Sequence, residues 1–131
     1  MLPNKFKPDG LYKLIRVGKD NDGGYLVCES SVINSNILIS FGISDDFSFE
    51  EKFQKINDVN ILAYDPTVNL NFFLKKFLHS LIKFNFLLFF KQFSNWLKFK
   101  TFFSKSKNKL SLKKIGKGGG VIYNYIPIEE I

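Results

Sequence analysis

The chain has 131 residues, enough for one domain with a real core, and its hydrophobic (45%) and charged (24%) fractions exclude a wholly disordered protein. Cys28 is the only cysteine, which excludes an intramolecular disulfide and a zinc site built from several cysteines, and it favours a reducing, cytoplasmic location. No apolar run approaches the ~20 residues of a transmembrane helix, and the first ten residues lack the apolar core of a secretory signal.

The net charge of +7 is unevenly distributed along the chain. Residues 1–65 carry seven basic and ten acidic side chains, whereas residues 66–131 carry twelve lysines and only two acids. Such asymmetry is found on surfaces that bind phosphates or anionic lipids, and equally on a solvated lysine-rich helix face. Composition alone leaves both interpretations open.

The first 35 residues predict two short strands, 14–17 and 25–28, separated by a turn-forming segment GKDNDGG that makes a hairpin or a tight turn. Residues 36–41 (NILISF) form a nearly continuous apolar run that ends at Gly42. A run of this kind is typical of a parallel strand that is covered on both faces. The single cysteine falls within the second short strand and is expected to be a small core residue.

A helix is predicted from about 48 to 56, because Ser48 and Glu51 have the spacing of a capping box and Phe49, Phe53 and Ile56 recur at helical spacing. The charged residues of this segment, Glu50 included, are expected on the outside. A second strand follows at 59–64 and is closed by Asp65-Pro66. Strand, glycine turn, helix and strand together predict one βαβ unit.

The remaining residues predict mainly helix, followed by a strand. From residue 70 an amphipathic helix is expected, whose polar side carries Lys75, Lys76, His79, Ser80 and Lys83 and whose apolar side carries Phe73, Leu74, Phe77, Leu78, Leu81, Ile82 and Phe84. Beyond residue 85 the pattern fits a second helix or an interrupted one. Residues 104–109 form a polar basic loop, 110–115 a strand, 116–120 a glycine turn, and 126–131 the start of another helix.

Two residues of the βαβ unit stand where a nucleotide-like ligand would be bound. Gly42 follows the first strand, where a glycine lets a ligand approach the backbone and the next helix directs its free amides toward it. Asp65 follows the next strand, about 20 residues on, where an acid can accept hydrogen bonds from ribose hydroxyls. Many α/β proteins share this arrangement, so the pair indicates a ligand site without identifying the ligand.

Three segments together resemble the FkbM-like methyltransferase family. They are LIRVGKDNDGGYLV, ILISFGISDDFSFEEKF and ILAYDPTV, which follow the family's R-x-G-x-x-x-D-G-G-Y, S-F-G-I-x-x-x-[WF]-S-F-[ED] and Y-x-[FY]-D-[PH]-[ST] elements in order and spacing. The resemblance covers about residues 13–69, and KKIGKG at 113–118 is similar to a weaker fourth element.

The resemblance implies an S-adenosylmethionine (SAM)-dependent methyltransferase with a Rossmann-like parallel sheet and flanking helices. The expected cofactor-binding residues come from two segments and one strand end: Asp22, Gly23, Gly24, Tyr25, Gly42, Ile43, Ser44 and Asp65. Arg16 would support the DGGY element. The family's L-K-I-D-[IV]-E-G strand and its substrate and catalytic residues have no match here, so the later strands are expected to be missing and no catalytic residue is assigned.

The expected organisation is a single domain, 1–131, made of an N-terminal hairpin (1–35), a SAM-binding βαβ unit (36–69), a basic Phe-rich helical segment (70–109) and a final strand with the start of a helix (110–131). The resemblance implies methyl transfer to an oxygen of a small metabolite, sugar or glycan. An alternative is a non-catalytic module whose Lys/Phe-rich segment docks on an anionic membrane or on nucleic acid. If the chain is a methyltransferase, we do not expect nucleic acid as a partner. We do expect that this segment could make peripheral membrane contact or form a homodimer.

Other candidates predict less. His79 has no Cys, Asp or Glu close to it in sequence, so no metal site is expected. Asp45 and Asp46 form a potential carboxylate pair, although acids before a helix more often interact with its dipole. The glycine turn at 116–120 lacks the Lys-Ser/Thr of a phosphate-binding loop.

Overall fold

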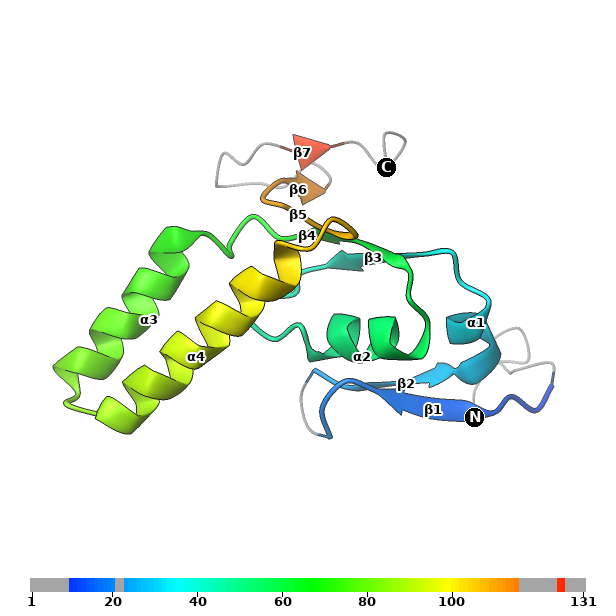
Figure 1. Ribbon diagram of the computed structural model, residues 1–131, viewed down its shortest axis with the longest axis horizontal. Helices are drawn as coiled ribbons and strands as arrows, with labels where there is room; N and C mark the ends of the chain where they lie inside the picture. The colour runs from blue at the N-terminus through cyan, green and yellow to red at the C-terminus, as the bar shows by residue number, and fades with distance from the viewer. Residues whose placement is uncertain (1–9, 21–22, 116–124, 127–131) are drawn as a thin grey trace, which may run out of the picture.

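The computed structural model describes residues 10–20, 23–115 and 125–126 (Figure 1). The described part is a mixed α/β structure in which helices flank a three-stranded parallel sheet. Its elements in chain order are β1 (Leu14–Val17), β2 (Tyr25–Cys28), α1 (Glu29–Ile33), β3 (Ile37–Phe41), α2 (Ser48–Ile56), β4 (Asn60–Tyr64), α3 (Leu70–Ile82), α4 (Phe86–Phe103), β5 (Asn108–Ser111), β6 (Lys114–Ile115) and β7 (Tyr125–Ile126).

The predicted βαβ unit is confirmed. β3 pairs in parallel with β4, from Ile37 opposite Asn60 to Phe41 opposite Tyr64, and α2 connects them. β5 then adds in parallel to β4, so the sheet order is β3-β4-β5. The carboxyl ends of β3 and β4 therefore lie at the same edge of the sheet, where ligands bind in open α/β folds.

The start of α2 differs from the predicted capping box. Ser48 is the first helical residue and not the cap, and its hydroxyl donates to the Gly23 carbonyl at 3.3 Å. Asp46 instead accepts a hydrogen bond from the Ser48 amide at 3.1 Å. The prediction was wrong because the hairpin, distant in sequence, supplies the partner that draws Ser48 away from its own helix.

The prediction that residues 36–41 are covered on both faces was also wrong. β3 is an edge strand of the described sheet, and alternate side chains, Ile37, Ile39 and Phe41, are exposed. Figure 1 shows the long helices α2, α3 and α4 on one side of the three-stranded sheet. The apolar run thus reflects strand propensity more than burial.

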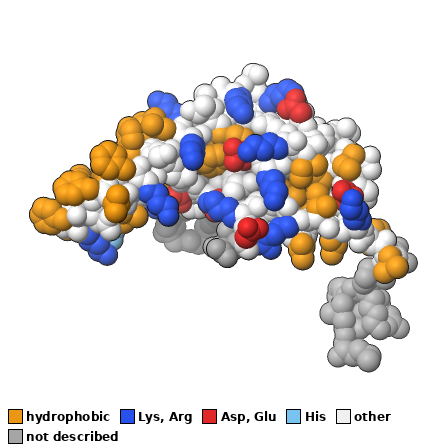
Figure 2. All heavy atoms as spheres, turned by 60° about the horizontal axis from the view of Figure 1, so that its bottom comes forward, with side chains coloured by type: hydrophobic (Ala, Val, Ile, Leu, Met, Phe, Trp, Pro, Cys, Tyr) orange, Lys and Arg blue, Asp and Glu red, His pale blue; other side chains and the backbone are white. Residues whose placement is uncertain are grey.

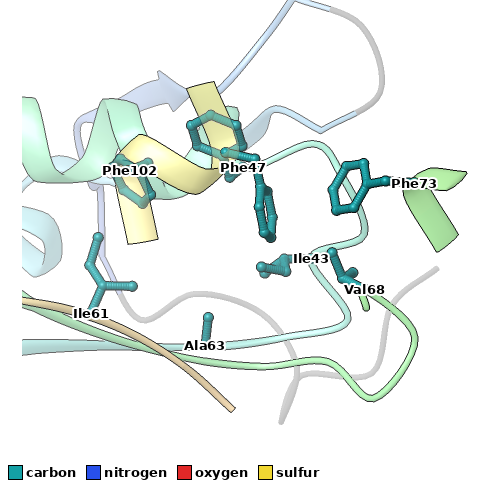
Figure 3. Packing of buried hydrophobic residues seen from close by; sticks show 8 residues of the cluster. Ile43, Phe47, Ile61, Ala63, Val68, Phe73 and Phe102 are labelled. Carbon is teal, nitrogen blue, oxygen red and sulfur yellow. The ribbon is translucent and has the colours of Figure 1, made fainter. Parts of the chain in front are cut away.

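Two clusters of buried side chains lie on the covered side of the sheet. The larger joins β4 to α3 and α4 and contains Ile43, Phe47, Ile61, Ala63, Val68, Phe73, Phe99 and Phe102, most of them labelled in Figure 3. The smaller joins the antiparallel β1–β2 hairpin and α1 to α2 through Val17, Val32, Phe53 and Val59. Phe53 of α2 belongs to the smaller cluster, with Phe49 packed against it, and Phe47, directly before the helix, belongs to the larger one, so α2 lies where the two clusters meet.

The α3–α4 pair is a helical hairpin that extends away from the sheet (Figure 1). The segment after residue 85 is one continuous helix, α4, which settles the alternative left open by its sequence. The two helices pack through aromatic side chains: the ring centroid of Phe77 lies 5.7 Å from that of Phe89 and 6.3 Å from that of Trp96. Among the described residues, no helix is long and apolar enough to cross a bilayer.

The predicted apolar side of α3 is buried only in part. Phe73 and Ser80 are buried, whereas Leu74, Leu78, Leu81 and Ile82 are exposed. The difference has a geometric reason: α3 packs on α4 through Phe77, so only part of its wide apolar face is covered. Ser80 satisfies its hydroxyl by donating to the Phe77 carbonyl at 2.7 Å.

The carboxyl-terminal expectations are met only in part. The strand predicted at 110–115 is divided into β5, which begins within the expected loop, and the short β6. The glycine turn at 116–120 lies outside the described residues, as do residues 127–131 of the expected helix start. Ile126, the first residue of that expected helix, lies in the short strand β7 instead.

Candidate functional site

A cavity of about 360 Å³ opens at the carboxyl end of β3, between the β1–β2 hairpin and the start of α2. Its volume is within the range of small-molecule sites, about 300–1,000 Å³. The lining residues are Gly23, Tyr25, Ser40, Phe41, Gly42, Ile43, Ser44, Asp46, Phe49 and Glu50. Two segments that are distant in sequence, 23–25 and 42–44, therefore meet at one hollow.

Gly42 lies where the sequence places a backbone approach. Its φ of +66° favours glycine, and a Cβ built there would have no heavy atom within 4 Å, so the backbone at this point faces open space. The Gly42 amide donates to the Tyr64 carbonyl at 3.0 Å, which continues the ladder one residue past β3. Ser44 also has a positive φ, +51°, while the buried side chain of Ile43 anchors the turn between them in the core (Figure 3).

Asp65 is close to this turn but is not among the cavity-lining residues. Only 3% exposed, it accepts the Ser44 amide at 2.8 Å on one oxygen, and the Thr67 amide at 2.8 Å and hydroxyl at 2.6 Å on the other. The carboxylate thus ties the loop after β3 to the loop after β4. In this structure its part in the site is to hold the Ser44 turn.

The DGGY element contributes Gly23 and Tyr25 to the cavity, while Gly24 packs against the backbone of Lys19. A Cβ on Gly24 would lie 1.8 Å from the Lys19 carbonyl oxygen, which only glycine avoids. Asp22 lies outside the described residues. Tyr25 is largely exposed and its ring meets Phe49 edge-on at 5.5 Å.

Arg16 supports the turn before this element, as the resemblance implied. Its guanidinium donates to the carbonyl oxygens of Lys19, at 3.0 Å, and Asp20. These bonds hold the segment that precedes Gly23, so the residue acts on the cavity through the backbone of the hairpin.

Asp45 and Asp46 have separate partners and do not form a carboxylate pair. Asp45 makes a salt bridge with Lys76 at 2.7 Å, and its carbonyl accepts from Asn95 of α4 at 3.0 Å. Asp46 accepts from Lys19 at 2.8 Å. Burial acts to raise the pKa of Asp46, but the hydrogen bonds from Lys19 and Ser48 outweigh it and hold the pKa below its ordinary value.

Glu50 is the residue of the site that sequence reasoning missed. It was expected on the outside of the helix, yet it is only 4% exposed and lines the cavity, with Oε2 lacking a hydrogen-bond partner among the described residues. Burial raises the pKa of this carboxyl, and the nearby charge of Asp46 adds to the rise. Its spacing of three from buried Phe53 was the available signal, since both fall on one helix face.

Cys28 and His79 lie outside the cavity lining. Cys28 is partly exposed, which corrects its assignment to the core, and its Sγ lies 3.1 Å from the Ser30 hydroxyl. That hydrogen bond, with those of Ser31, lowers the pKa of the thiol to about 7. His79 is exposed on α3, and the described residues contain no cluster of His, Cys, Asp and Glu that could hold a metal ion.

No family model, curated protein or solved structure matches this chain. The FkbM-like resemblance therefore rests on the three motifs and stays a prediction.

Proposed function

We propose that the cavity binds SAM and that the chain is the cofactor-binding part of a methyltransferase of the FkbM-like kind. The observation that carries the proposal is the meeting of Gly23 and Tyr25 with the Gly42 to Ser44 turn around one hollow. Those are five of the eight residues that the resemblance implies. The parallel β3-β4-β5 sheet, with α2 connecting its first two strands, supports the proposal as part of a Rossmann-like sheet.

The lining chemistry suits the parts of SAM. The SAM carboxylate can approach the open backbone at Gly42, and the partial positive charge at the amino end of α2 favours a carboxylate there. The buried carboxyl of Glu50 and that of Asp46 suit an ammonium group or ribose hydroxyls. Tyr25, Phe41 and Phe49 supply aromatic surface for the adenine or the sulfonium. Asp65 would act indirectly, by fixing Ser44.

Methyl transfer would move the sulfonium methyl group to an acceptor oxygen, leaving S-adenosylhomocysteine, while the acceptor hydroxyl loses its proton to a base. This chain's own contribution is to bind and orient the cofactor, and we assign no residue as the base. A small metabolite, sugar or glycan as the acceptor comes from the family resemblance alone.

The test is calorimetric titration of SAM and S-adenosylhomocysteine into the purified chain. Tyr25→Ala removes an exposed aromatic side chain of the cavity, so we expect the fold to persist and the Kd to rise about tenfold or more. Tyr12→Ala is the matched control, because Tyr12 is similarly exposed but does not line the cavity. If the folded wild-type chain binds neither ligand, or if both variants bind equally well, the proposal is wrong.

Asp65→Ala would be a poor probe of ligand binding. Because Asp65 is buried and accepts three hydrogen bonds, its loss would disturb the two loops whether or not a ligand is bound. Gly42→Val is similarly ambiguous, since the positive φ of Gly42 strains any side chain there.

A further inference from the structure

The end of the α3–α4 hairpin exposes a continuous group of large apolar side chains. We call this group, Leu78, Ile82, Phe84, Phe86, Leu87 and Phe90, the apolar tip. Every residue from 81 to 87 is exposed, and Phe84 and Leu87 are 82% and 86% exposed. Figure 2 shows hydrophobic side chains gathered at the end of the molecule that the hairpin forms. Contiguous apolar surface of this kind marks an interaction site.

The turn at the tip is built around an unusual choice of residue. The Phe84 amide donates to the Leu81 carbonyl at 2.9 Å and the Asn85 amide to the Ser80 carbonyl at 3.0 Å, which is the Schellman arrangement that ends a helix. Phe84 takes the left-handed position of this motif, with φ +50°, where glycine or asparagine is favoured. A strained and almost fully exposed phenylalanine does not stabilise the isolated fold. Binding to a partner would explain why an apolar side chain stands at this position.

The same turn also fixes the start of α4. Asn85 caps that helix by accepting the Leu88 amide on its side chain at 2.9 Å. Asn85 thus takes part both in the end of α3 and in the start of α4. The exposed side chains therefore lie on a short, hydrogen-bonded turn. Because the backbone of this turn is already ordered, binding costs it little conformational entropy.

The charge of the hairpin is of one sign. α3 and α4 contain no acidic residue, whereas Lys83 lies in the turn itself, Lys75 on α3 and Lys91 on α4, all three exposed. Blue lysine side chains border the hydrophobic end in Figure 2. Apolar side chains bordered by lysines are the composition of surfaces that enter an anionic lipid interface, where long basic side chains reach the headgroups.

We propose that the apolar tip docks the protein on an anionic membrane surface. Phe84 and its neighbours would enter the boundary between headgroups and acyl chains, and Lys83 and Lys91 would meet the lipid phosphates. A second copy fits less well, because pairing two such tips would bring lysines together with no acid on either hairpin to offset them. Nucleic acid fits less well because aliphatic Leu78, Ile82 and Leu87 offer nothing to phosphates or base edges.

The experiment is flotation of the purified chain with phosphatidylcholine vesicles, with and without phosphatidylserine, at low and high salt. We expect binding only to the anionic vesicles, weakened by salt. Phe84→Asn should lower the partition constant about tenfold or more, because it removes the most prominent inserting side chain. Since asparagine suits the left-handed backbone, this variant should fold at least as stably as the wild type, so lost binding cannot be put down to unfolding.

Leu70→Asn is the matched control, because Leu70 is a similarly exposed apolar residue at the opposite end of α3, and its binding should equal that of the wild type. Lys83→Glu should weaken binding to anionic vesicles about fivefold or more. Absence of wild-type binding, equal binding to neutral vesicles, or equal binding by Phe84→Asn would each overturn the proposal.

Two further measurements separate the other occupants. Sedimentation that shows a dimer of the wild type and a monomer of Phe84→Asn, without vesicle binding, would assign the tip to a second copy. Tip-dependent binding of a labelled RNA oligonucleotide, again without vesicle binding, would assign it to nucleic acid. Either outcome would overturn the membrane proposal.

Discussion

At the carboxyl ends of β3 and β4, polar side chains are buried and hydrogen-bonded, and at the end of the α3–α4 hairpin large apolar side chains are exposed. Asp65 illustrates the first region, since both of its oxygens hold loops in place. Phe84 illustrates the second, since it is strained and contributes little to the core. The contrast teaches that Asp65 is explained by the stability it gives to two loops, whereas the strained and exposed Phe84 is not explained by stability and marks a place where binding is to be sought.

The contrast is sharpest within α4, which belongs to the core at one end and to the tip at the other. Phe102→Ala should lower the free energy of unfolding by about 3 to 5 kcal/mol, because Phe102 is 5% exposed and its ring centroid lies 5.0 Å from that of Phe47. Phe90→Ala should change it by no more than about 0.5 kcal/mol, because Phe90 is 66% exposed. Urea unfolding measures both. Equal losses would mean that the tip is buried in the folded protein and that the comparison fails.

A second prediction concerns the buried carboxylate at the end of β4. Asp65→Ala should lower the free energy of unfolding by about 2 to 3 kcal/mol, because the amides of Ser44 and Thr67 lose their acceptor. Asp58→Ala is the control: Asp58 is exposed and paired with Lys107 at the surface, where an ion pair contributes about 0 to 1 kcal/mol. Similar losses in the two variants would show that Asp65 is not the structural tie described above.

The smallest change in stability is expected for a substitution of Glu50, and this change depends on pH. Its pKa is raised in the folded state, so the folded protein holds this proton more tightly than the unfolded chain. The stability that Glu50 contributes is therefore present at pH values below its unfolded pKa and is lost as the pH rises through the folded pKa. Glu50→Gln cannot ionise, so its melting temperature should exceed that of the wild type at pH 7.

This difference should shrink as the pH falls below about 4, where the wild-type carboxyl is protonated in both states. Melting curves across that range measure it. The comparison would need revision if Glu50→Gln were less stable than the wild type at pH 7, because the hydrogen bonds to the charged carboxylate, among them that of Ser40, would then outweigh the cost of its burial. Glu51→Gln, on the exposed side of the same helix, is the control variant.

Local sequence patterns determined most strands and helices of the described residues, although the short helix α1 was not predicted. Apolar runs bounded by Gly42 and by Asp65-Pro66 predicted β3 and β4 to within a residue, and helical periodicity predicted α2 and α3. These features depend on propensity and on neighbours within a few residues, which a sequence displays directly. The meeting of the DGGY element with Gly42 was predicted only through the family resemblance, not from the residues themselves.

Only the tertiary structure decided which faces are buried. Glu50 and Ser80 lie inside although they were expected on polar helix faces, while Ile39, Leu78 and Ile82 lie outside. The reason is that burial depends on which elements pack together, here α3 on α4 and the hairpin on α2, and these contacts join residues that are far apart in the chain. Periodicity shows that a helix has an apolar side, but a partner's position determines how much of that side is covered.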